Sequence, residues 1–326
     1  MAIHAFAATE NDAFERCARL GRGINLGNAM EMPRGRPLWE PQPEHLDLIK
    51  AAGFNSIRIP IRWSEYAATD APFAIDPAWF TGVDTLVNAA LDRKLAVVIN
   101  VHHFNELMAD PVGQHQRFLA IWNGIAEHYR EFGPDLFFEL LNEPHGKLRP
   151  QLWNELLSES LAVVRRSNPN RAVIVGTAPW GGVRGLKDLV MPEGDRNLIL
   201  TVHYYEPYHF THQGASWANK GADAWLGTTW DGTRNEQRAI RADFDQVAAW
   251  AKEHRRPVYL GEFGAYNKAD MESRARWTDF VAREAEKRGM SWAYWEACSG
   301  YGAYDPKAGA WREPLLRALM PSATGR

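Results

Sequence analysis

The chain has 326 residues, of which 45% are hydrophobic and 24% charged, a composition typical of soluble globular proteins with material for a large core. The formal net charge of −3 is near neutral and no basic block stands out, so the charge favours neither nucleic acid nor an anionic membrane as a partner. No apolar stretch approaches the roughly 20 residues of a membrane-spanning helix. Fourteen tryptophans are an unusual number and suggest a surface for flat apolar faces, such as those of sugar rings.

A short apolar run that ends in polar residues recurs along the chain, and each run is followed by a stretch with helical spacing. The runs lie at residues 22–28, 56–61, 96–103, 136–144, 172–180, 198–207, 257–264 and 291–297. Intervening segments such as PEHLDLIKAAG and WTDFVAREAEKRG carry apolar residues at i, i+3 and i+4 and end in Gly. Eight strands alternating with helices predict an α/β protein, a (β/α)8 TIM barrel in which residues 1–326 form a single domain.

An open doubly wound sheet is the alternative arrangement for such an alternation. The first strand–helix turn, GINLGNAME, is not a G-x-G-x-x-G loop, and the sequence holds no G-x-x-x-x-G-K-[ST] motif. The barrel is therefore preferred.

One connection, residues 206–240 after the sixth run, is longer than the others. Long loops in compact domains are usually functional or disordered. This loop contains Trp217, Trp225 and Trp230, which argue against disorder. We therefore predict a structured wall of a cleft.

The two cysteines and the N-terminus bear on redox state and location. Cys17 precedes the first strand and Cys298 follows the last, so they should lie at opposite ends of the barrel as free thiols. The first residues, MAIHAFAATENDAFERC, lack a basic segment followed by a long apolar one, so we predict no signal peptide. Location is left open: secreted if a leader has been removed, cytoplasmic otherwise.

Polar and aromatic residues gather at the ends of the predicted strands, where barrel enzymes place their active sites. In chain order they are Asn28 with Glu31, Arg58, His102 with His103, Asn142 with Glu143, Trp180, His203 with Tyr205, Glu262, and Trp295. The glutamates at the ends of the fourth and seventh strands face each other across a small barrel. Such a pairing lets one carboxylate attack while the other transfers protons.

Several of these residues also have a purely structural interpretation. Taken alone, Glu143 before a proline fits a turn that opens a helix as well as it fits a catalytic acid. Glu262 has apolar neighbours, where a solvated loop carboxylate is not expected. Trp295 could belong to the core, although its place at the last strand end favours a sugar platform. Glu139 should lie lower in the barrel, where a buried carboxylate needs a partner such as Arg58.

The spacing of the histidines predicts the directions of their side chains. His102 and His103 are adjacent, so on a regular strand their side chains point to opposite faces. A metal pair usually takes alternate residues, as in H-x-H, so no metal site is predicted, and one of the two histidines is equally well explained as a packing residue. His203 and Tyr205 are two apart, share a face and can both enter the cleft.

Motifs on five of the strands together resemble a known family. They are IRIP on the second strand, VHH on the third, NEP on the fourth, HYY on the sixth and GEFG on the seventh. In this order and spacing they resemble glycoside hydrolase family 5, cellulase-type retaining enzymes, over about residues 20–317. The runs GINLGNAME, HYYEPYHFTHQGASW and YLGEFGAYNKADMESR further resemble bacterial endo-β-1,4-glucanases, some of which also accept mannan.

The resemblance implies a role for each residue at the strand ends. Glu143 would be the general acid/base and Glu262 the nucleophile, with Arg58 and Tyr205 orienting Glu262 and keeping it ionised. Asn142 would bind the 2-hydroxyl of the sugar being cleaved, and His203 would support Glu143 or the leaving group. The substrate-binding residues would be Asn28, Glu31, His102, His103, Trp180, Trp217 and Trp295. The carboxyl groups should lie about 5 to 5.5 Å apart, with only the acid protonated at neutral pH.

These implications predict a retaining endo-β-1,4-glucanase that acts as a monomer on a polysaccharide or oligosaccharide, without metal or organic cofactor. No separate carbohydrate-binding module, nucleic acid partner or membrane association is expected. An endo-β-1,4-mannanase or a dual glucanase/mannanase is the enzyme alternative, decided by hydrogen bonding near Asn28, Glu31 and His103. A catalytically inactive carbohydrate-binding barrel is disfavoured because both glutamates are present, and a metal-dependent hydrolase would lose its activity in EDTA.

Overall fold

The computed structural model of the chain describes residues 10–321. Eight parallel strands close into a barrel in chain order, and β8 pairs with β1. The strands are β1 (Arg22–Asn25), β2 (Ser56–Ile61), β3 (Ala96–Val101), β4 (Leu136–Glu139), β5 (Val173–Gly176), β6 (Leu198–Tyr204), β7 (Val258–Phe263) and β8 (Ser291–Tyr294). The predicted (β/α)8 barrel is confirmed.

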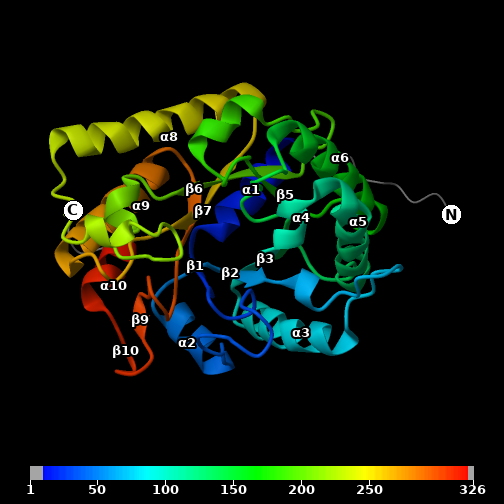
Figure 1. Cartoon of the computed structure of the whole chain (residues 1–326), viewed down its shortest axis with the longest axis horizontal. Coiled ribbons are helices and arrows are strands. Elements are labelled where there is room, and N and C mark those ends of the chain that lie inside the picture. The colour runs from blue at the N-terminus through cyan, green and yellow to red at the C-terminus, as the bar shows by residue number, and fades with distance from the viewer. Residues whose placement is uncertain (1–9, 322–326) are drawn as a thin grey trace.

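Helices surround the barrel (Figure 1). They are α1 (Glu10–Leu20), α2 (Pro43–Ala51), α3 (Pro77–Asp92), α4 (Asn105–Ala109), α5 (Pro111–His128), α6 (Pro150–Ser167), α7 (Tyr208–Thr211), α8 (Arg234–His254), α9 (Met271–Lys287) and α10 (Glu313–Leu319). Short 3-10 helices lie at η1 (Trp63–Glu65), η2 (Val183–Asp188) and η3 (Ala222–Trp225), and β9 (Tyr304–Asp305) pairs with β10 (Ala310–Trp311). Along residues 10–321, no helix combines the length and apolarity needed to cross a membrane.

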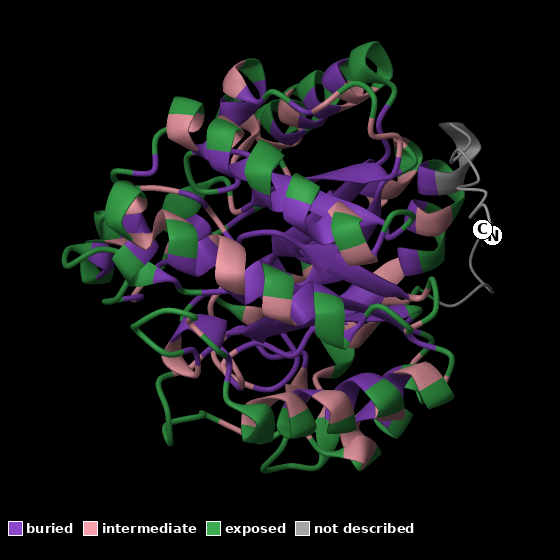
Figure 2. Ribbon diagram, turned by 90° about the vertical axis from the view of Figure 1, so that its right-hand side faces the viewer, coloured by how far each residue is buried: buried purple, intermediate pink, exposed green. Residues whose placement is uncertain are grey.

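Helix α8 illustrates how the sequence sets these elements. It begins at a capping box, in which Thr233 and Glu236 each satisfy the backbone N–H of the other. Its buried residues are spaced three or four apart and form one apolar stripe: Ile240, Phe244, Val247 and Trp250. The outer helix faces are exposed while the strands are buried, as Figure 2 shows.

The lower part of the barrel is filled by side chains and closed by α1. Inward-facing residues such as Val98, Phe137 and Tyr259 form a buried cluster with Cys17 and Leu20 of α1. The Cys17 thiol donates to a backbone carbonyl of β7 at 3.3 Å, and burial raises its pKa to about 12. Both cysteines are free, as predicted.

Except for β2, which matches its predicted run, the strands are shorter than the apolar runs from which they were predicted. The first run was extended to residue 28 and the fourth to residue 144, whereas β1 ends at Asn25 and β4 at Glu139. The hydrophobic runs continue beyond the last ladder hydrogen bonds because the first loop residues are still buried under the surrounding helices, as Leu140 and Leu141 are. Most of the polar and aromatic residues predicted at strand ends therefore lie in loops, whereas Arg58, His203 and Glu262 lie on β2, β6 and β7.

Candidate active site

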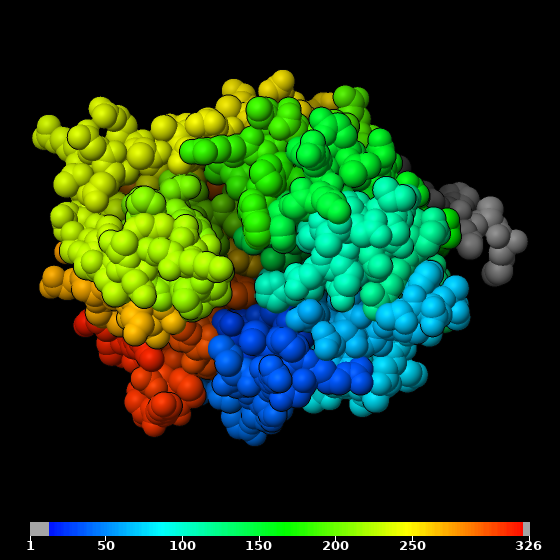
Figure 3. Space-filling view, viewed as in Figure 1, coloured from blue at the N-terminus to red at the C-terminus, as the bar shows by residue number. Residues whose placement is uncertain are grey.

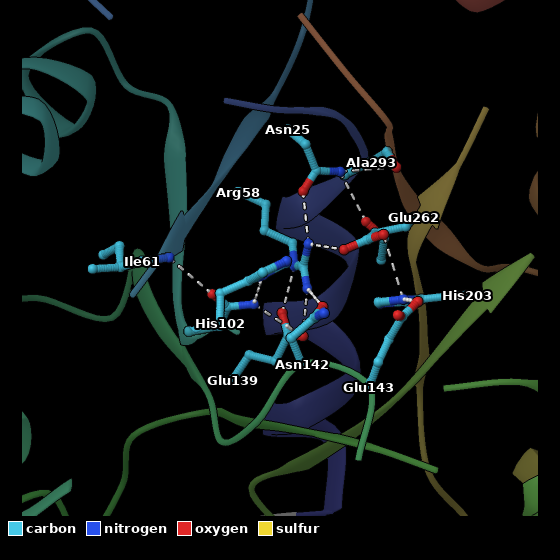
Figure 4. A network of polar contacts seen from close by, with 12 residues as sticks. Asn25, Arg58, Ile61, His102, Glu139, Asn142, Glu143, His203, Glu262 and Ala293 are labelled. Atoms are coloured by element: carbon cyan, nitrogen blue, oxygen red, sulfur yellow. Dashed lines mark hydrogen bonds and ion pairs between the residues drawn. The ribbon is translucent and has the colours of Figure 1, made fainter. Parts of the chain in front are cut away.

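Arg58, on β2, is the centre of a buried polar network inside the barrel (Figure 4). Its Nε and Nη2 donate to the two oxygens of Glu139 at 2.6 and 2.7 Å, and its Nη1 donates to Oε1 of Glu262 at 2.6 Å. Nη1 also donates to Oδ1 of Asn25, and Nη2 to Oδ1 of Asn142, both at 2.8 Å. All five N–H donors of the guanidinium are thus used. The predicted contact between Glu139 and Arg58 is confirmed.

The network keeps Arg58 charged and fixes Glu262. Burial lowers the pKa of Arg58, but Glu139 and Glu262 raise it by more, so its pKa lies well above the usual value. The second oxygen of Glu262 accepts a hydrogen bond from Tyr205 at 2.9 Å. Burial and the charge of Glu262 raise the pKa of Tyr205, which therefore remains a neutral donor. Both oxygens of Glu262 are held, as expected for a carboxylate with one orientation.

Glu143 lies opposite Glu262 and contacts a histidine. Its Oε1 is 2.8 Å from Nδ1 of His203, which is 3.5 Å from Oε2 of Glu262. One oxygen of each carboxylate and this nitrogen all lie within 4.8 Å of one another. The Glu143 side chain is 22% exposed against 5% for Glu262, so Glu143 is the more accessible to solvent protons.

His203 lies within reach of both carboxylates, and their charges affect its pKa. Burial lowers its pKa, but Glu262 and the hydrogen bond to Glu143 raise it by more, so the net shift is upward. His203 contacts Glu143 and Tyr205 contacts Glu262, so the two side chains share a face, as predicted.

The loops after β4 and β5 hold Glu143 in place. The N–H of Trp180 donates to the carbonyl of Pro144 at 3.0 Å, and Nδ1 of His145 lies 2.6 Å from the carbonyl of Glu143. The ring of His145 stacks on Trp180, with centroids 3.6 Å apart and planes 11° apart. A Cβ on Gly181 would meet the ring of His203 at 3.2 Å, a tight contact, and the φ of 64° also favours glycine at this position.

Four non-glycine residues of these loops have left-handed backbone conformations. Asn28, His103, Glu143 and Trp180 have φ between 43° and 62° and follow β1, β3, β4 and β5. Such conformations are unfavourable for residues with a Cβ and persist where surrounding contacts enforce them, often at functional sites. The strain coincides with the residues that the sequence assigned to the site.

The prediction that His102 and His103 point to opposite faces was wrong. Their ring centroids are 4.4 Å apart and the planes 87° apart. The alternation of a strand no longer applies, because β3 ends at Val101 and His103 adopts a φ of 51°. His102 also stacks on Trp295 at 5.9 Å and 10°, so both histidines border the same end of the barrel.

The loop after β1 supports Trp295 from below. A Cβ on Gly27 would lie 2.8 Å from the indole of Trp295, so the ring rests against the backbone there. Glu31 is 1% exposed and accepts hydrogen bonds from the backbone N–H groups of Asn28 and Ala29. Burial raises the pKa of Glu31 to about 8. Glu31 thus orders the loop around Asn28, and its role toward a substrate stays a prediction.

The long connection after β6 is ordered, as predicted. Gln213 ties it together through hydrogen bonds to the carbonyls of Phe210 and Thr228 and from the N–H of Gly227. Trp230 is buried, whereas Trp217 is 63% exposed. Figure 3 shows this segment as a yellow-green lobe beside a hollow near the centre of the face.

Sequence reasoning missed some residues of the site. Asn25 accepts a hydrogen bond from Arg58, and His145 stacks on Trp180. Both belong to motifs in which only neighbouring residues were predicted to be functional. Tyr208 and His212 lie in the long connection, where His212 lies edge-on to Tyr205 and stacks on Tyr208. The repeated aromatic and histidine residues in HYYEPYHFTH were the signal that could have identified them.

One group within residues 10–321 has the donors and spacing for a metal ion: Glu143, His203 and Glu262. These side chains already bind one another, and the guanidinium of Arg58, 2.6 Å from Glu262, opposes a second positive charge there. Independence from metals and cofactors stays a prediction, which an assay in EDTA tests.

Comparison with known proteins identifies the family. The cellulase family, glycosyl hydrolase family 5, matches residues 21–300. The chain belongs to this family. Endoglucanase H of Acetivibrio thermocellus is 35% identical over 286 residues, which are 87% of this chain and 30% of that protein. The chain therefore spans less than a third of this curated relative's length.

Solved structures agree with the assignment to family 5. The endoglucanase Cel5A of Thermotoga maritima is 51% identical, with a TM-score of 0.92 over 94% of this chain and 99% of that one. Structures of Cel5A with cellobiose and with mannotriose each superpose with a TM-score of 0.92 at 50% identity. The family expected from the motifs is confirmed.

Proposed function

We propose that the chain is a retaining endo-β-1,4-glucanase that cleaves internal bonds of β-1,4-glucans. The observation that carries this proposal is the approach of Glu143 and Glu262, with oxygens within 4.8 Å of each other. Retaining enzymes place the carboxyl groups about 5 to 5.5 Å apart, whereas inverting enzymes leave about 6.5 to 9.5 Å for a water molecule.

The first step forms a covalent intermediate. Glu262, held by Arg58 and Tyr205, attacks the anomeric carbon, and a new C–O ester bond forms as the glycosidic bond breaks. Glu143 gives its proton to the departing oxygen, which leaves as a sugar hydroxyl. The contact with His203 keeps the Glu143 carboxyl aimed at that oxygen.

The second step releases the product. Glu143, now a carboxylate, takes a proton from water, whose oxygen attacks the same carbon and displaces Glu262. Two inversions give net retention of the β-configuration. Both glutamates return to their starting protonation states.

Asn142 is suited to bind the substrate during both steps. Its Oδ1 must face Arg58, because a guanidinium only donates hydrogen bonds. The Nδ2 is therefore left as a donor for the 2-hydroxyl of the sugar. A hydrogen bond there that strengthens in the transition state would raise kcat.

Relatives and aromatic residues support a glucan as the substrate. Relatives over most of the chain are named endoglucanases, and Cel5A binds cellobiose in one structure and mannotriose in another. Trp295, Trp180 and Trp217 offer rings on which sugar faces can stack. One chain supplies every residue of the proposed site, so a monomer would suffice.

Two variants and a control test the mechanism. Glu262→Ala should abolish nearly all turnover, whereas Glu143→Ala should reduce hydrolysis of cellopentaose far more than that of an aryl cellobioside with a good leaving group. Equal losses on both substrates for Glu143→Ala would contradict its role as the acid. Glu155→Ala, at an exposed position of α6, is the matched control and should leave both rates unchanged.

The product and the substrate range complete the test. NMR should show the β-anomer first, and an initial α-anomer would exclude a retaining mechanism. The ratio kcat/KM should be higher on carboxymethyl cellulose and lichenan than on mannan. The reverse order would replace the glucanase assignment by a mannanase.

A further inference from the structure

Tyr208, the first residue of α7, presents a supported aromatic ring to solvent. The side chain is 38% exposed, and its ring stacks on His212 with centroids 4.1 Å and planes 15° apart. His212 is itself buried and lies 3.0 Å from the hydroxyl of Thr211. Burial lowers the pKa of His212 to about 4, so its ring is neutral near pH 7. One face of the tyrosine is thus backed by a fixed, uncharged ring.

The position of Tyr208 relative to the two glutamates defines which part of a substrate it meets. Burial raises the pKa of Tyr208, and the negative charges of Glu143 and Glu206 raise it further. His212, on which Tyr208 stacks, also lies edge-on to Tyr205 with centroids 5.0 Å apart, and Tyr205 donates to Glu262. Tyr208 therefore borders the pair of glutamates from the β6 side. Trp295 and His102, in contrast, lie on the β8 and β3 side of the barrel.

Two further aromatic groups continue this side of the cleft. Trp225 lies edge-on to Tyr208, with centroids 5.9 Å apart, and stacks on His209 at 4.4 Å. Trp180, 56% exposed, belongs to the loop after β5. In Figure 3 the yellow-green lobe of the connection after β6 and the green segments after β4 and β5 border the same hollow.

We propose that Tyr208, backed by His212 and flanked by Trp225, is a stacking platform for a glucosyl unit on the leaving-group side of the cleaved bond. A pyranose ring presents a face of C–H groups, and a flat, rigid aromatic ring with one free face matches it at little entropic cost. The platform rests on the proposed function, because the leaving-group side is defined by Glu143 as the acid.

The experiment compares substrates with and without a sugar on that side. In β-cellobiosyl fluoride the leaving group is a single atom, whereas cellopentaose can place glucosyl units beyond Glu143. Tyr208→Ala should lower kcat/KM for cellopentaose about tenfold, the lower end of what one apolar contact discriminates, and leave that for the fluoride unchanged. Tyr208→Phe, which keeps the ring, should retain the rate on both substrates.

Product analysis and a surface control sharpen the result. With Tyr208→Ala, cleavage of cellopentaose should shift toward its reducing end, because fewer units are held beyond the acid. Phe14→Ala, which removes a 44% exposed ring from α1 at the other end of the barrel, should leave the cleavage pattern unaltered. Equal losses on cellopentaose and the fluoride, or an unchanged cleavage pattern, would overturn the platform.

Binding measurements separate the platform from the catalytic proposal. Calorimetric titration of cellopentaose into Glu262→Ala, with and without Tyr208→Ala, should show about tenfold weaker binding in the double variant. Equal affinities would refute the platform even if hydrolysis is observed. If the wild-type chain cleaves neither substrate, the proposed function fails, while this comparison still decides the platform. Tyr208→Leu, which keeps apolar volume but is not flat, serves in place of a poorly folding alanine variant.

Discussion

Replacement of Glu139 by glutamine removes one of the two carboxylates that neutralise Arg58 inside the barrel. Glu139 is fully buried and accepts two short hydrogen bonds from the guanidinium. Glutamine can accept only one of them, and its amide NH2 then faces a second donor. Breaking a buried ion pair costs about 3 to 5 kcal/mol. We expect about 3 kcal/mol, the lower end, because Glu262 still contacts Arg58.

The loss should be visible in both stability and activity. The midpoint of thermal unfolding should fall by about 4 °C, and urea denaturation should give the free energy directly. Because Glu139 no longer offsets the charge of Arg58 beside Glu262, the acidic limb of kcat/KM against pH should move to lower pH. His203, Tyr205 and Glu143, the other groups near Glu262, are unchanged in this variant.

A control variant and two outcomes decide this reasoning. Glu155→Gln, at an exposed site, should change the free energy of unfolding by less than about 0.5 kcal/mol. If Glu139→Gln is as stable as this control, the ion pair does not hold Arg58 in place. A lower stability with an unmoved acidic limb would limit Glu139 to a structural role.

Three other predictions concern pH and packing. The pKa of Glu31 is about 8 in the folded chain, so its proton stabilises the fold below about pH 4.5 and this contribution is lost as the pH rises to 8, by up to about 1.4 kcal/mol per unit. Urea unfolding of Glu31→Gln should therefore depend less on pH across this window, and an identical dependence would argue against the shift. His203 has a raised pKa, so the basic limb of kcat/KM should lie above pH 6.5 and move down in His203→Asn; an unmoved limb would mean that another group holds the proton. Gly27→Ala would press a methyl group against Trp295 and should raise KM for cellopentaose severalfold, whereas an unchanged KM would show that Trp295 does not bind the sugar.

The fold could be predicted because its signal is repeated. Alternating apolar runs and amphipathic segments predict a barrel whatever the exact ends of each strand. The buried partner of Glu139 was also predictable, since a carboxylate at an inward position of a strand needs a cation and Arg58 shares that depth. Both arguments depend only on strand periodicity and on the cost of burying charge.

Loop geometry could not be predicted in the same way. The facing of His102 and His103 depends on where β3 ends and on a left-handed backbone at His103, neither of which periodicity specifies. Asn25 reaches Arg58 because the two are register partners in neighbouring strands, a relation that appears only once the barrel closes. Tyr208 lies in a connection without a periodic pattern. Its stacking on His212 depends on the conformation of that loop, which periodicity does not specify.

The complete use of the five donors of Arg58 has a consequence for how fast the site can react. A guanidinium whose N–H groups are all hydrogen-bonded has a fixed orientation before a substrate binds. Water molecules in the same place would have to reorient as charge moves during bond cleavage, whereas the dipoles of this network already have their final orientation. The cost of that reorganisation is met when the chain folds, so each catalytic cycle begins with the electric field of the site in place.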